Sequence, residues 1–260
     1  MYCCQSVVDQ VEKVQLILTN HADLNAKDYE GKDALHYSCL YSHVASVKLL
    51  IKEGLQVNDR DAKGQTPLFS CIQSNVDRIE KMQFLISKGA DINVKDNKGR
   101  SFLRESYQWG DIACVKLLIK EGLGVNDRDD KGYRPLYYCI QSNVDRIEKI
   151  QFLLSVGADT NVKGDEWRSL LHESCVWGDI ACVKLLIKQG INVNGRDFYG
   201  KTPLFECIQS NVDRIEKMRF LISVGADINL KDHDMRSLLH ASCQWGDVAF
   251  VKLLIKEGLQ

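Results

Sequence analysis

Cysteine and histidine are the residues of this chain that could ligate a metal ion or act as nucleophiles, and the ten cysteines recur at fixed intervals. Nine of them occupy three positions that repeat every 68 residues or a multiple of 68: Cys3, Cys71, Cys139 and Cys207, then Cys39, Cys175 and Cys243, then Cys114 and Cys182. Tyr107 stands at the second position, and Ser46 and Phe250 stand at the third. Because a metal ligand would not be exchanged for tyrosine or phenylalanine, and because no CxxC pair occurs, we expect no metal site. The sequence instead predicts reduced, mostly buried thiols that act as small apolar side chains.

Catalytic motifs are missing from the chain. His36, His172 and His240 share one repeated position, and no Ser/His/Asp or Cys/His set can be assembled without reusing repeated positions. The phosphate-binding patterns GxxxxGK[ST] and GxGxxG do not occur. We therefore expect no catalytic residues, no cofactor and no small-molecule substrate.

Composition and charge favour an ordered protein without a nucleic-acid or membrane partner. Apolar residues make up 45% and charged residues 27% of the 260 residues, a balance typical of folded soluble chains. The formal net charge of −1 provides no basic field for DNA, RNA or an anionic membrane. No apolar run approaches the roughly 20 residues that span a bilayer, and the start MYCCQSVVDQ lacks the features of a secretory signal. We expect an intracellular protein, cytoplasmic, with the nucleus as an alternative.

The elements that would position these residues follow the same period. The string CIQSNVDRIEK occurs unchanged from Cys71, Cys139 and Cys207, and each 68-residue period divides into a 33-residue and a 35-residue half. The halves alternate as eight units: 1–27 (partial), 28–60, 61–95, 96–128, 129–163, 164–196, 197–231 and 232–260 (partial). A period of this length predicts one solenoid of stacked units.

Each unit consists of a turn signal followed by two short helical segments. A glycine turn such as AKGQ (62–65) comes first. Thr-Pro-Leu follows it in two units, and proline suits the first turn of a helix. The second segment carries an apolar run such as VKLLI, and a glycine such as Gly89 comes after it as a helix stop. The predicted fold class is therefore all-α.

This pattern resembles the ankyrin repeat, whose hallmark is T-P-L-H-x-A, then V-x-L-L and G-A-D-x-N. Matching segments include Thr66-Pro67-Leu68, Leu35-His36 and Gly89-Ala90-Asp91-Ile92-Asn93. The resemblance covers all 260 residues; among the departures, Trp167 and Met235 replace the turn glycine. It implies an ankyrin solenoid that binds partners on its fingertips and concave surface. It also implies that histidines such as His36 bond the backbone of the neighbouring unit and that asparagines such as Asn58 cap loops.

The repeated string is interpreted as scaffold rather than as a binding site. Asp77 followed by Glu80 fits a capping box at the start of the second helix of its unit. Apolar residues recur at helical spacing and predict a buried face: Val76, Ile79, Met82 and Leu85. Three charged residues are expected to point outward: Arg78, Glu80 and Lys81. Tandem duplication produces identical copies without selection, so identity alone does not indicate a site.

Differences between the copies gather at the turns and at the front of the first helices, where they introduce aromatic residues. The predicted partner contacts are Tyr133, Tyr138, Trp167, Phe198 and Tyr199, a basic row of Lys32, Arg100, Arg168, Lys201 and Arg236, and the acidic residues Glu105 and Glu206. Aromatics grouped on one face are typical of a binding hot spot. The alternatives are that turns tolerate change, or that aromatics pack between neighbouring fingers, as expected for Tyr137.

The sequence thus predicts a non-catalytic scaffold that binds a protein or peptide on its finger and first-helix surface. The alternative is a regulatory or targeting segment of a larger enzyme or channel. Neither end carries the polar outer face that terminal solenoid units need, since apolar residues such as Val11 and Leu254 recur there. We therefore expect the array to belong to a longer one, or its ends to be covered by another segment or subunit.

Overall fold

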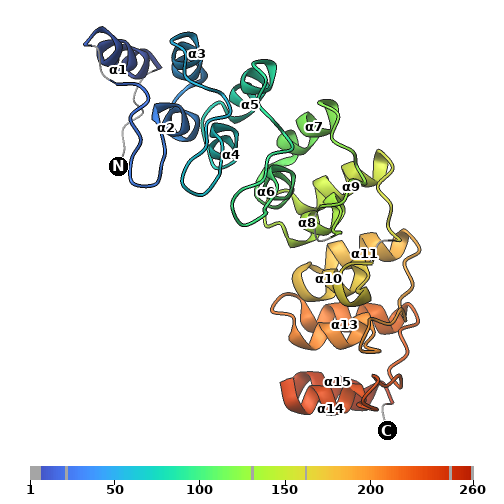
Figure 1. Cartoon of the computed structure of the whole chain (residues 1–260). Coiled ribbons are helices and arrows are strands. Elements are labelled where there is room, and N and C mark those ends of the chain that lie inside the picture. Colours follow the sequence, from blue (N-terminus) through green and yellow to red (C-terminus); the bar gives the residue numbers. More distant parts are fainter. Residues whose placement is uncertain (1–6, 21–22, 130–131, 162, 246–247, 259–260) are drawn as a thin grey trace. The chain divides into compact units, whose positions relative to one another are not determined.

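The structure, a computed structural model, describes residues 7–20, 23–129, 132–161, 163–245 and 248–258. They form two compact units, the N-unit up to Leu123 and the C-unit from Gly124. The N-unit contains α1 (Val7–Thr19), α2 (Ala34–Tyr41), α3 (Val44–Lys52), α4 (Pro67–Ile72), α5 (Arg78–Ser87), α6 (Phe102–Trp109) and α7 (Ile112–Lys120). The C-unit contains α8 (Pro135–Gln141), α9 (Arg146–Ser155), the 3-10 helix η1 (Asp165–Trp167), α10 (Leu170–Trp177), α11 (Ile180–Lys188), α12 (Pro203–Glu206), the 3-10 helix η2 (Cys207–Gln209), α13 (Arg214–Ser223), α14 (Leu238–Trp245) and α15 (Val248–Lys256). Figure 1 shows helix pairs joined by loops.

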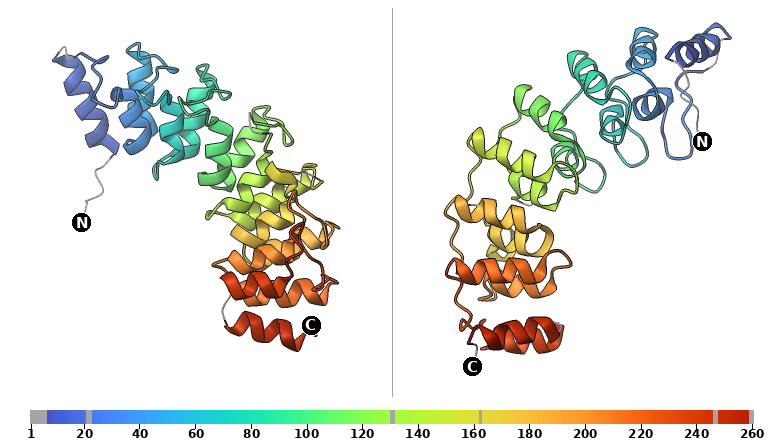
Figure 2. Two further views of the ribbon diagram at one scale, coloured as in Figure 1. Left: turned by 60° about the horizontal axis from the view of Figure 1, so that its bottom comes forward. Right: turned by 180° about the vertical axis from the view of Figure 1, so that it is seen from behind.

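The helices of each unit form two layers. In the N-unit, the first helices of successive pairs, α2, α4 and α6, contact one another in order, and the second helices α3, α5 and α7 do the same. In the C-unit, α8, α10 and α12 form one layer and α9, α11 and α13 the other. Figure 2 shows the pairs within each unit from two further sides. The described residues contain isolated bridges but no longer strand, and the all-α prediction is confirmed.

Proline, a polar cap and glycine set the helix bounds. Pro67, Pro135 and Pro203 occupy the first turn of α4, α8 and α12, as the sequence predicts. Their missing N–H would have no helical partner at that place. Ser169 caps α10 by accepting a main-chain N–H with its side chain. Gly89 follows α5 with a φ of +86°, the left-handed conformation that ends many helices.

Apolar side chains fill the space between successive helices. Leu35, Leu68 and Phe102, on three consecutive first helices, are fully buried, and Phe69 meets Phe102 edge to face with ring centroids 5.4 Å apart. Seven free thiols are buried: Cys39, Cys71, Cys114, Cys139, Cys175, Cys182 and Cys207. Burial raises the pKa of three of them, Cys114, Cys139 and Cys182, to about 12. The prediction that the cysteines are mostly buried is confirmed for the described residues; Cys243 is exposed, and Cys3 and Cys4 lie outside them.

Polar side chains join neighbouring repeats where the sequence predicts it. His36 Nε2 lies 3.1 Å from the Gln65 carbonyl oxygen in the next repeat. The Asn58 amide donates to the Gly89 carbonyl at 2.9 Å, and its oxygen accepts the Asp91 N–H at 2.9 Å. Both expectations, a histidine that bonds a neighbouring backbone and an asparagine that caps a loop, are confirmed at these positions.

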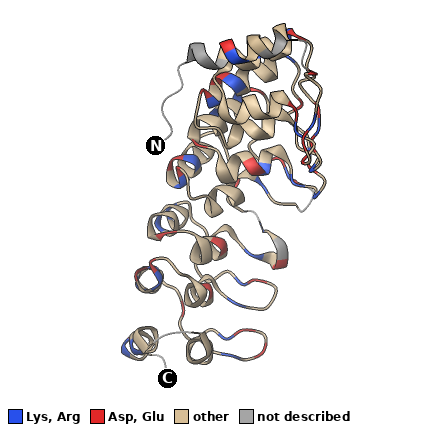
Figure 3. Cartoon of the chain, turned by 90° about the vertical axis from the view of Figure 1, so that its left-hand side faces the viewer, with Lys and Arg blue, Asp and Glu red and all other residues tan. Residues whose placement is uncertain are grey.

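The loop that precedes each first helix projects as a finger, and main-chain hydrogen bonds join neighbouring fingertips. In the N-unit, the Ala62 N–H donates to the Glu30 carbonyl at 2.7 Å. In the C-unit, the His233 N–H donates to the Tyr199 carbonyl at 2.9 Å. Acidic and basic residues are interspersed along the fingers (Figure 3). Fingers therefore align within each unit independently of their side chains.

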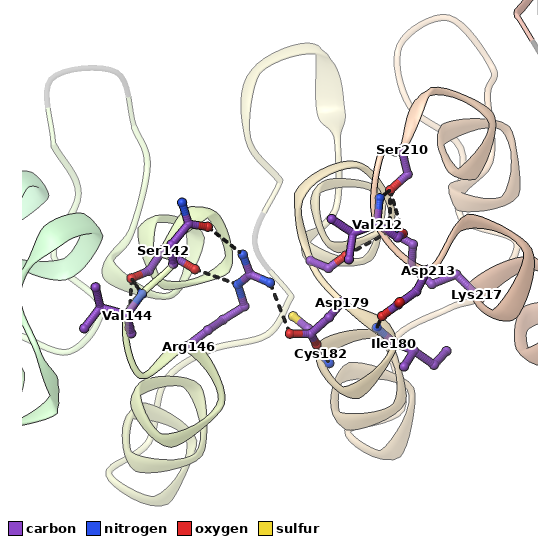
Figure 4. Close-up of polar contacts among 12 residues, drawn as sticks. Ser142, Val144, Arg146, Asp179, Ile180, Cys182, Ser210, Val212, Asp213 and Lys217 are labelled. Carbon is purple, nitrogen blue, oxygen red and sulfur yellow. Dashed lines mark hydrogen bonds and ion pairs between the residues drawn. The ribbon is translucent and has the colours of Figure 1, made fainter.

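Asp77 caps a helix of the preceding repeat, and the prediction of a capping box in its own helix is wrong. Its backbone is left-handed, with a φ of 43°, and its side chain makes no cap hydrogen bond to α5. Its Oδ2 atom instead accepts the Val44 N–H at 3.0 Å and lies 3.0 Å from His43 Nδ1, at the start of α3. These hydrogen bonds lower the pKa of the Asp77 carboxyl. Asp213 accepts the Ile180 N–H in the same way at 3.0 Å (Figure 4).

Lys81 is buried, and the prediction that it points outward is wrong. Its ammonium donates to the Cys39 and Ser42 carbonyl oxygens at 2.7 and 2.9 Å and to Ser74 Oγ at 2.6 Å. The two carbonyls lie at the C-terminal end of α2, where such groups lack helical partners and the helix dipole is negative. Burial lowers the pKa of the Lys81 ammonium. Lys217 makes the corresponding bonds at the end of α10.

Arg78 bonds to the following repeat. Its Nη1 atom lies 2.8 Å from Asp111 Oδ2, and Arg146 contacts Asp179 in the same way at 3.2 Å (Figure 4). Of the three charged residues expected to point outward, only Glu80 is exposed. The repeated string therefore bonds to the repeat before it through its aspartate and lysine, and to the repeat after it through its arginine. These contacts support the interpretation of the string as scaffold.

Candidate functional site

A depression of about 900 Å³ lies against the fingers of the C-unit. We call this depression the finger pocket. Six aromatic or basic side chains line it: Trp167, Phe198, Tyr199, Lys163, Arg196 and His233. A smaller depression of about 330 Å³ shares Trp167, Lys163 and Arg196 with it. The structure therefore brings three of the five predicted aromatic contacts together at one place.

Trp167 is held in a backbone conformation that favours glycine. It stands where two fingers of the N-unit have Gly31 and Gly99. Its φ is 61°, and the preceding Glu166 has a φ of 55°. A side chain in this left-handed region costs about 1–2 kcal/mol, yet the indole remains 63% exposed. Strain of this kind is concentrated at functional sites, where the gain lies outside the fold itself.

Glu166 holds the neighbouring finger in place. Its carbonyl oxygen accepts the Phe198 N–H at 2.6 Å, and its carboxylate accepts the Tyr199 hydroxyl at 2.7 Å. The hydroxyl bond to this carboxylate raises the pKa of Tyr199. The Phe198 and Tyr199 rings meet edge to face with centroids 5.4 Å apart, and both remain exposed. Two apolar rings are thus fixed in orientation at a solvent-facing edge.

Arg168 and Glu206, two of the predicted partner contacts, form part of a buried ion cluster. Arg168 lies 2.9 Å from a carboxylate oxygen of Glu173 and 2.9 Å from one of Glu206. Glu206 is 4% exposed, and Glu173 is buried as well. Burial raises the pKa of both carboxyls, while Arg168 acts in the opposite direction. Two carboxylates therefore share one guanidinium beneath the first-helix surface.

Tyr138 and Tyr133 lie in a packed tyrosine cluster. Tyr138, a predicted partner contact, is only 3% exposed and donates its hydroxyl to the Asp129 carboxylate. The half-buried Tyr133 stacks on Tyr137 with centroids 4.1 Å apart. Its ring also covers Gly164, where an added Cβ would come within 2.9 Å of Tyr133 Cε1. The packing alternative raised for the aromatics applies to this cluster.

The basic row makes contacts within its own unit. The pairs are Lys32 with Glu30 at 2.7 Å, Arg100 with Asp96 at 2.7 Å and with Glu105 at 3.4 Å, and Arg236 with Asp234. Lys201 Nζ lies 6.0 Å from the centroid of the Tyr199 ring. Internal carboxylates thus compensate most of the charge that the sequence presents as a row.

A second set of exposed aromatics is missing from the predicted contacts. Tyr41 and Trp109 end the first helices α2 and α6 in the N-unit, and Trp177 and Trp245 end α10 and α14 in the C-unit. Their spacing of 68 residues was the available signal. Because these positions are aromatic in every copy, a comparison of differences between copies does not detect them.

Within the described ranges, no group of three or more His, Cys, Asp or Glu side chains could hold a metal ion. No helix in the same ranges has both the length and the apolar character needed to cross a membrane.

Comparisons with known proteins agree with the repeat pattern. A family model described as ankyrin repeats (3 copies) matches residues 1–96, 78–164 and 147–232. Inversin from Homo sapiens is 28% identical over 148 residues, which cover 56% of this chain and 14% of inversin. Rabankyrin-5 from Homo sapiens is 30% identical over 153 residues, which cover 58% of this chain and 13% of rabankyrin-5. The crystal structure of the human ASB11 ankyrin repeat domain matches with a TM-score of 0.70 at 21% identity, covering 85% of this chain and 97% of that one. The chain thus spans a small part of the length of these two curated relatives.

Proposed function

This chain belongs to the ankyrin-repeat family, and on that premise we propose that it is a non-catalytic scaffold that binds a protein or peptide partner. Ankyrin repeats generally mediate protein–protein interaction. In this proposal the partner contacts the finger and first-helix surface of the C-unit, with Trp167, Phe198 and Tyr199 as its apolar anchors. The protein acts in the cytoplasm.

The observation that carries this proposal is the exposed, strained Trp167. A glycine at this position would relieve the left-handed strain, and the N-unit uses glycine at the corresponding place. Exposed aromatic anchors with a fixed geometry are the residues that dominate binding energy at protein interfaces. The neighbouring Phe198 and Tyr199 extend the same apolar edge.

Replacing Trp167 by glycine separates binding from folding. We expect Trp167→Gly to weaken partner binding by about 1–3 kcal/mol, typical of losing an aromatic anchor, while the free energy of unfolding stays equal or rises because strain is removed. Affinity capture with quantitative mass spectrometry would compare the two chains, and urea denaturation would measure stability. Tyr29→Ala, which removes an exposed aromatic from a finger of the N-unit, is the matched control. Equal capture by all three chains would contradict the proposed surface.

A second candidate function follows from the length of the relatives. Inversin and rabankyrin-5 match this chain over 14% and 13% of their lengths. We propose as the alternative that these repeats serve as the regulatory or targeting part of a larger enzyme or channel. Sequencing full-length transcripts tests it, because a catalytic or channel domain in the same reading frame would favour this alternative over a free-standing scaffold.

A further inference from the structure

We propose that the finger pocket binds an acidic peptide segment anchored by one aromatic or large aliphatic side chain. This inference rests on the proposed function and adds the chemistry of the partner.

The apolar part of the pocket can accommodate one large side chain. Trp167, Phe198 and Tyr199 expose their rings to the same depression of about 900 Å³. The hydroxyl bond from Tyr199 to Glu166 orients the Tyr199 ring before any partner arrives, and the Phe198 ring meets it edge to face. A pre-organised apolar edge reduces the entropy lost on binding, which favours an anchor side chain over a purely polar contact.

The two acidic groups on the pocket wall, Asp197 and Asp234, already have partners within the chain. Asp197 is buried, and its Oδ1 atom accepts the Tyr199 and Lys201 N–H groups at 2.9 and 2.8 Å. Asp234 pairs with Arg236. Asp234 is thus compensated by Arg236, whereas Asp197 keeps its negative charge because its donors are neutral N–H groups. The two cations on the wall, Lys163 and Arg196, outnumber this one carboxylate.

Two basic groups on the wall, Lys163 and Arg196, are not paired with a carboxylate of the described residues. The Lys163 ammonium lies 5.0 Å from the centroid of the Trp167 ring, a cation–π arrangement that leaves its charge exposed. Arg196 donates through Nη1 to the Gly200 and Lys231 carbonyl oxygens at 3.1 and 2.8 Å, which are neutral acceptors. Neither cation forms an ion pair within the described ranges. The pocket therefore presents positive charge beside apolar rings, and this combination is complementary to an acidic segment with an apolar anchor.

The N-unit provides an internal comparison. A depression of about 390 Å³ lies against its fingers, and none of the residues that line it is aromatic. They include Ala62, Asn97, Asp96, Arg100 and Glu105. Arg100 there is paired with Asp96 and Glu105. Lys95 is the sequence counterpart of Lys163, and Gly99 is the counterpart of Trp167. Variants of Lys95 therefore change the net charge equally without touching the finger pocket.

The test is selection of a phage-displayed library of random 12-residue peptides on the intact chain. Enriched peptides are then synthesised, and their affinities are measured by isothermal titration calorimetry for the wild type, Trp167→Gly, Lys163→Gln and Lys95→Gln. We expect Asp or Glu within about three positions of an aromatic or large aliphatic residue. Affinity should fall at least ~10-fold with Trp167→Gly, ~3- to 10-fold with Lys163→Gln, and less than ~2-fold with Lys95→Gln.

The outcomes separate this inference from the function on which it rests. One outcome would overturn the acidic occupant and leave the pocket as a recognition site. In that outcome the enriched peptides depend on Trp167, are basic or uncharged, and bind Lys163→Gln and the wild type with equal affinity. Peptides that bind Trp167→Gly and the wild type equally, or the absence of any enriched peptide, would overturn both the occupant and the pocket.

Discussion

Two carboxylates share one guanidinium in the C-unit, and this imbalance should make stability depend on pH. Burial raises the pKa of Glu206 above its ordinary value of 4.5, so between pH 4.5 and the raised value the folded state binds more protons than the unfolded state. Stability from the neutral form is therefore fully present below pH 4.5 and is lost as the pH rises through the folded-state pKa. Glutamine mimics the neutral carboxyl at every pH.

We accordingly expect Glu206→Gln to keep or raise the free energy of unfolding at pH 7, by about 1 kcal/mol per unit of pKa elevation. The difference from the wild type should shrink at pH 4, and urea denaturation at both values measures it. Glu216→Gln, at an exposed residue, is the control and should show no such trend. A larger gain at pH 4 than at pH 7 would contradict the sign of the argument.

At the scale of the helix, the cap supplied by Asp77 serves α3 rather than α5, and hydrogen exchange can distinguish the two. We expect Asp77→Ala to cost about 0.5–2 kcal/mol of stability and to speed amide exchange at Val44, whose N–H Asp77 accepts. Asp213→Ala should cost less, because α11 keeps a cap of its own from Asp179 to the Cys182 N–H, whereas the side chain at the α3 N-cap makes no such bond. Faster amide exchange confined to α5 would contradict this expectation and support a capping box in α5.

The sequence predicts the helices and the turn glycines well because these depend on local chemistry and spacing. Of the face predicted to be buried, Met82 and Leu85 are buried, whereas Val76 and Ile79 are half-buried. The sequence fails at Asp77 and Lys81 because their partners lie far away along the chain: Val44 is 33 residues from Asp77, and Cys39 is 42 residues from Lys81. Lys81 also shares its helix face with Leu85, four residues on, so its position predicts burial while its charge predicts exposure. Burial prevails because the preceding repeat supplies carbonyl acceptors for the Lys81 ammonium.

The site is less predictable than the fold for a related reason. Variation between copies marks Trp167, Phe198 and Tyr199, which are exposed, and it marks Tyr138 and Glu206 as well, which are buried. Each of these last two has an internal partner at a position that hardly changes between copies. Tyr138 bonds Asp129, a position that is aspartate in all three long units, and Glu206 bonds Arg168, a position that is basic in every short unit. Differences between copies therefore report both recognition and local repacking, and burial is needed to separate them.

At the scale of the whole molecule, a buried lysine in each unit joins a long repeat to the short repeat before it: Lys81 in the N-unit and Lys217 in the C-unit. Solenoid stability is a sum of repeats and their nearest-neighbour interfaces. We expect Lys81→Met to cost about 3–5 kcal/mol, because it leaves the Cys39 and Ser42 carbonyls buried without a donor. Hydrogen exchange should accelerate in α2, α4 and α5 and change little in α10 to α13. Lys52→Met, at an exposed residue, is the control, and uniform acceleration through both units would contradict nearest-neighbour coupling.

The hydrogen bonds between fingertips use peptide groups, and the residues that donate them are as unlike as Ala62, Asn97, Phe198 and His233. Every amino acid except proline carries this donor, so exchange of a tip residue leaves the attachment between fingers in place. A newly duplicated repeat can therefore diversify its tip immediately, without first acquiring a compensating change elsewhere. The chain can broaden what it recognises one fingertip at a time, and a library randomised at those four donor positions should retain folded members at high frequency.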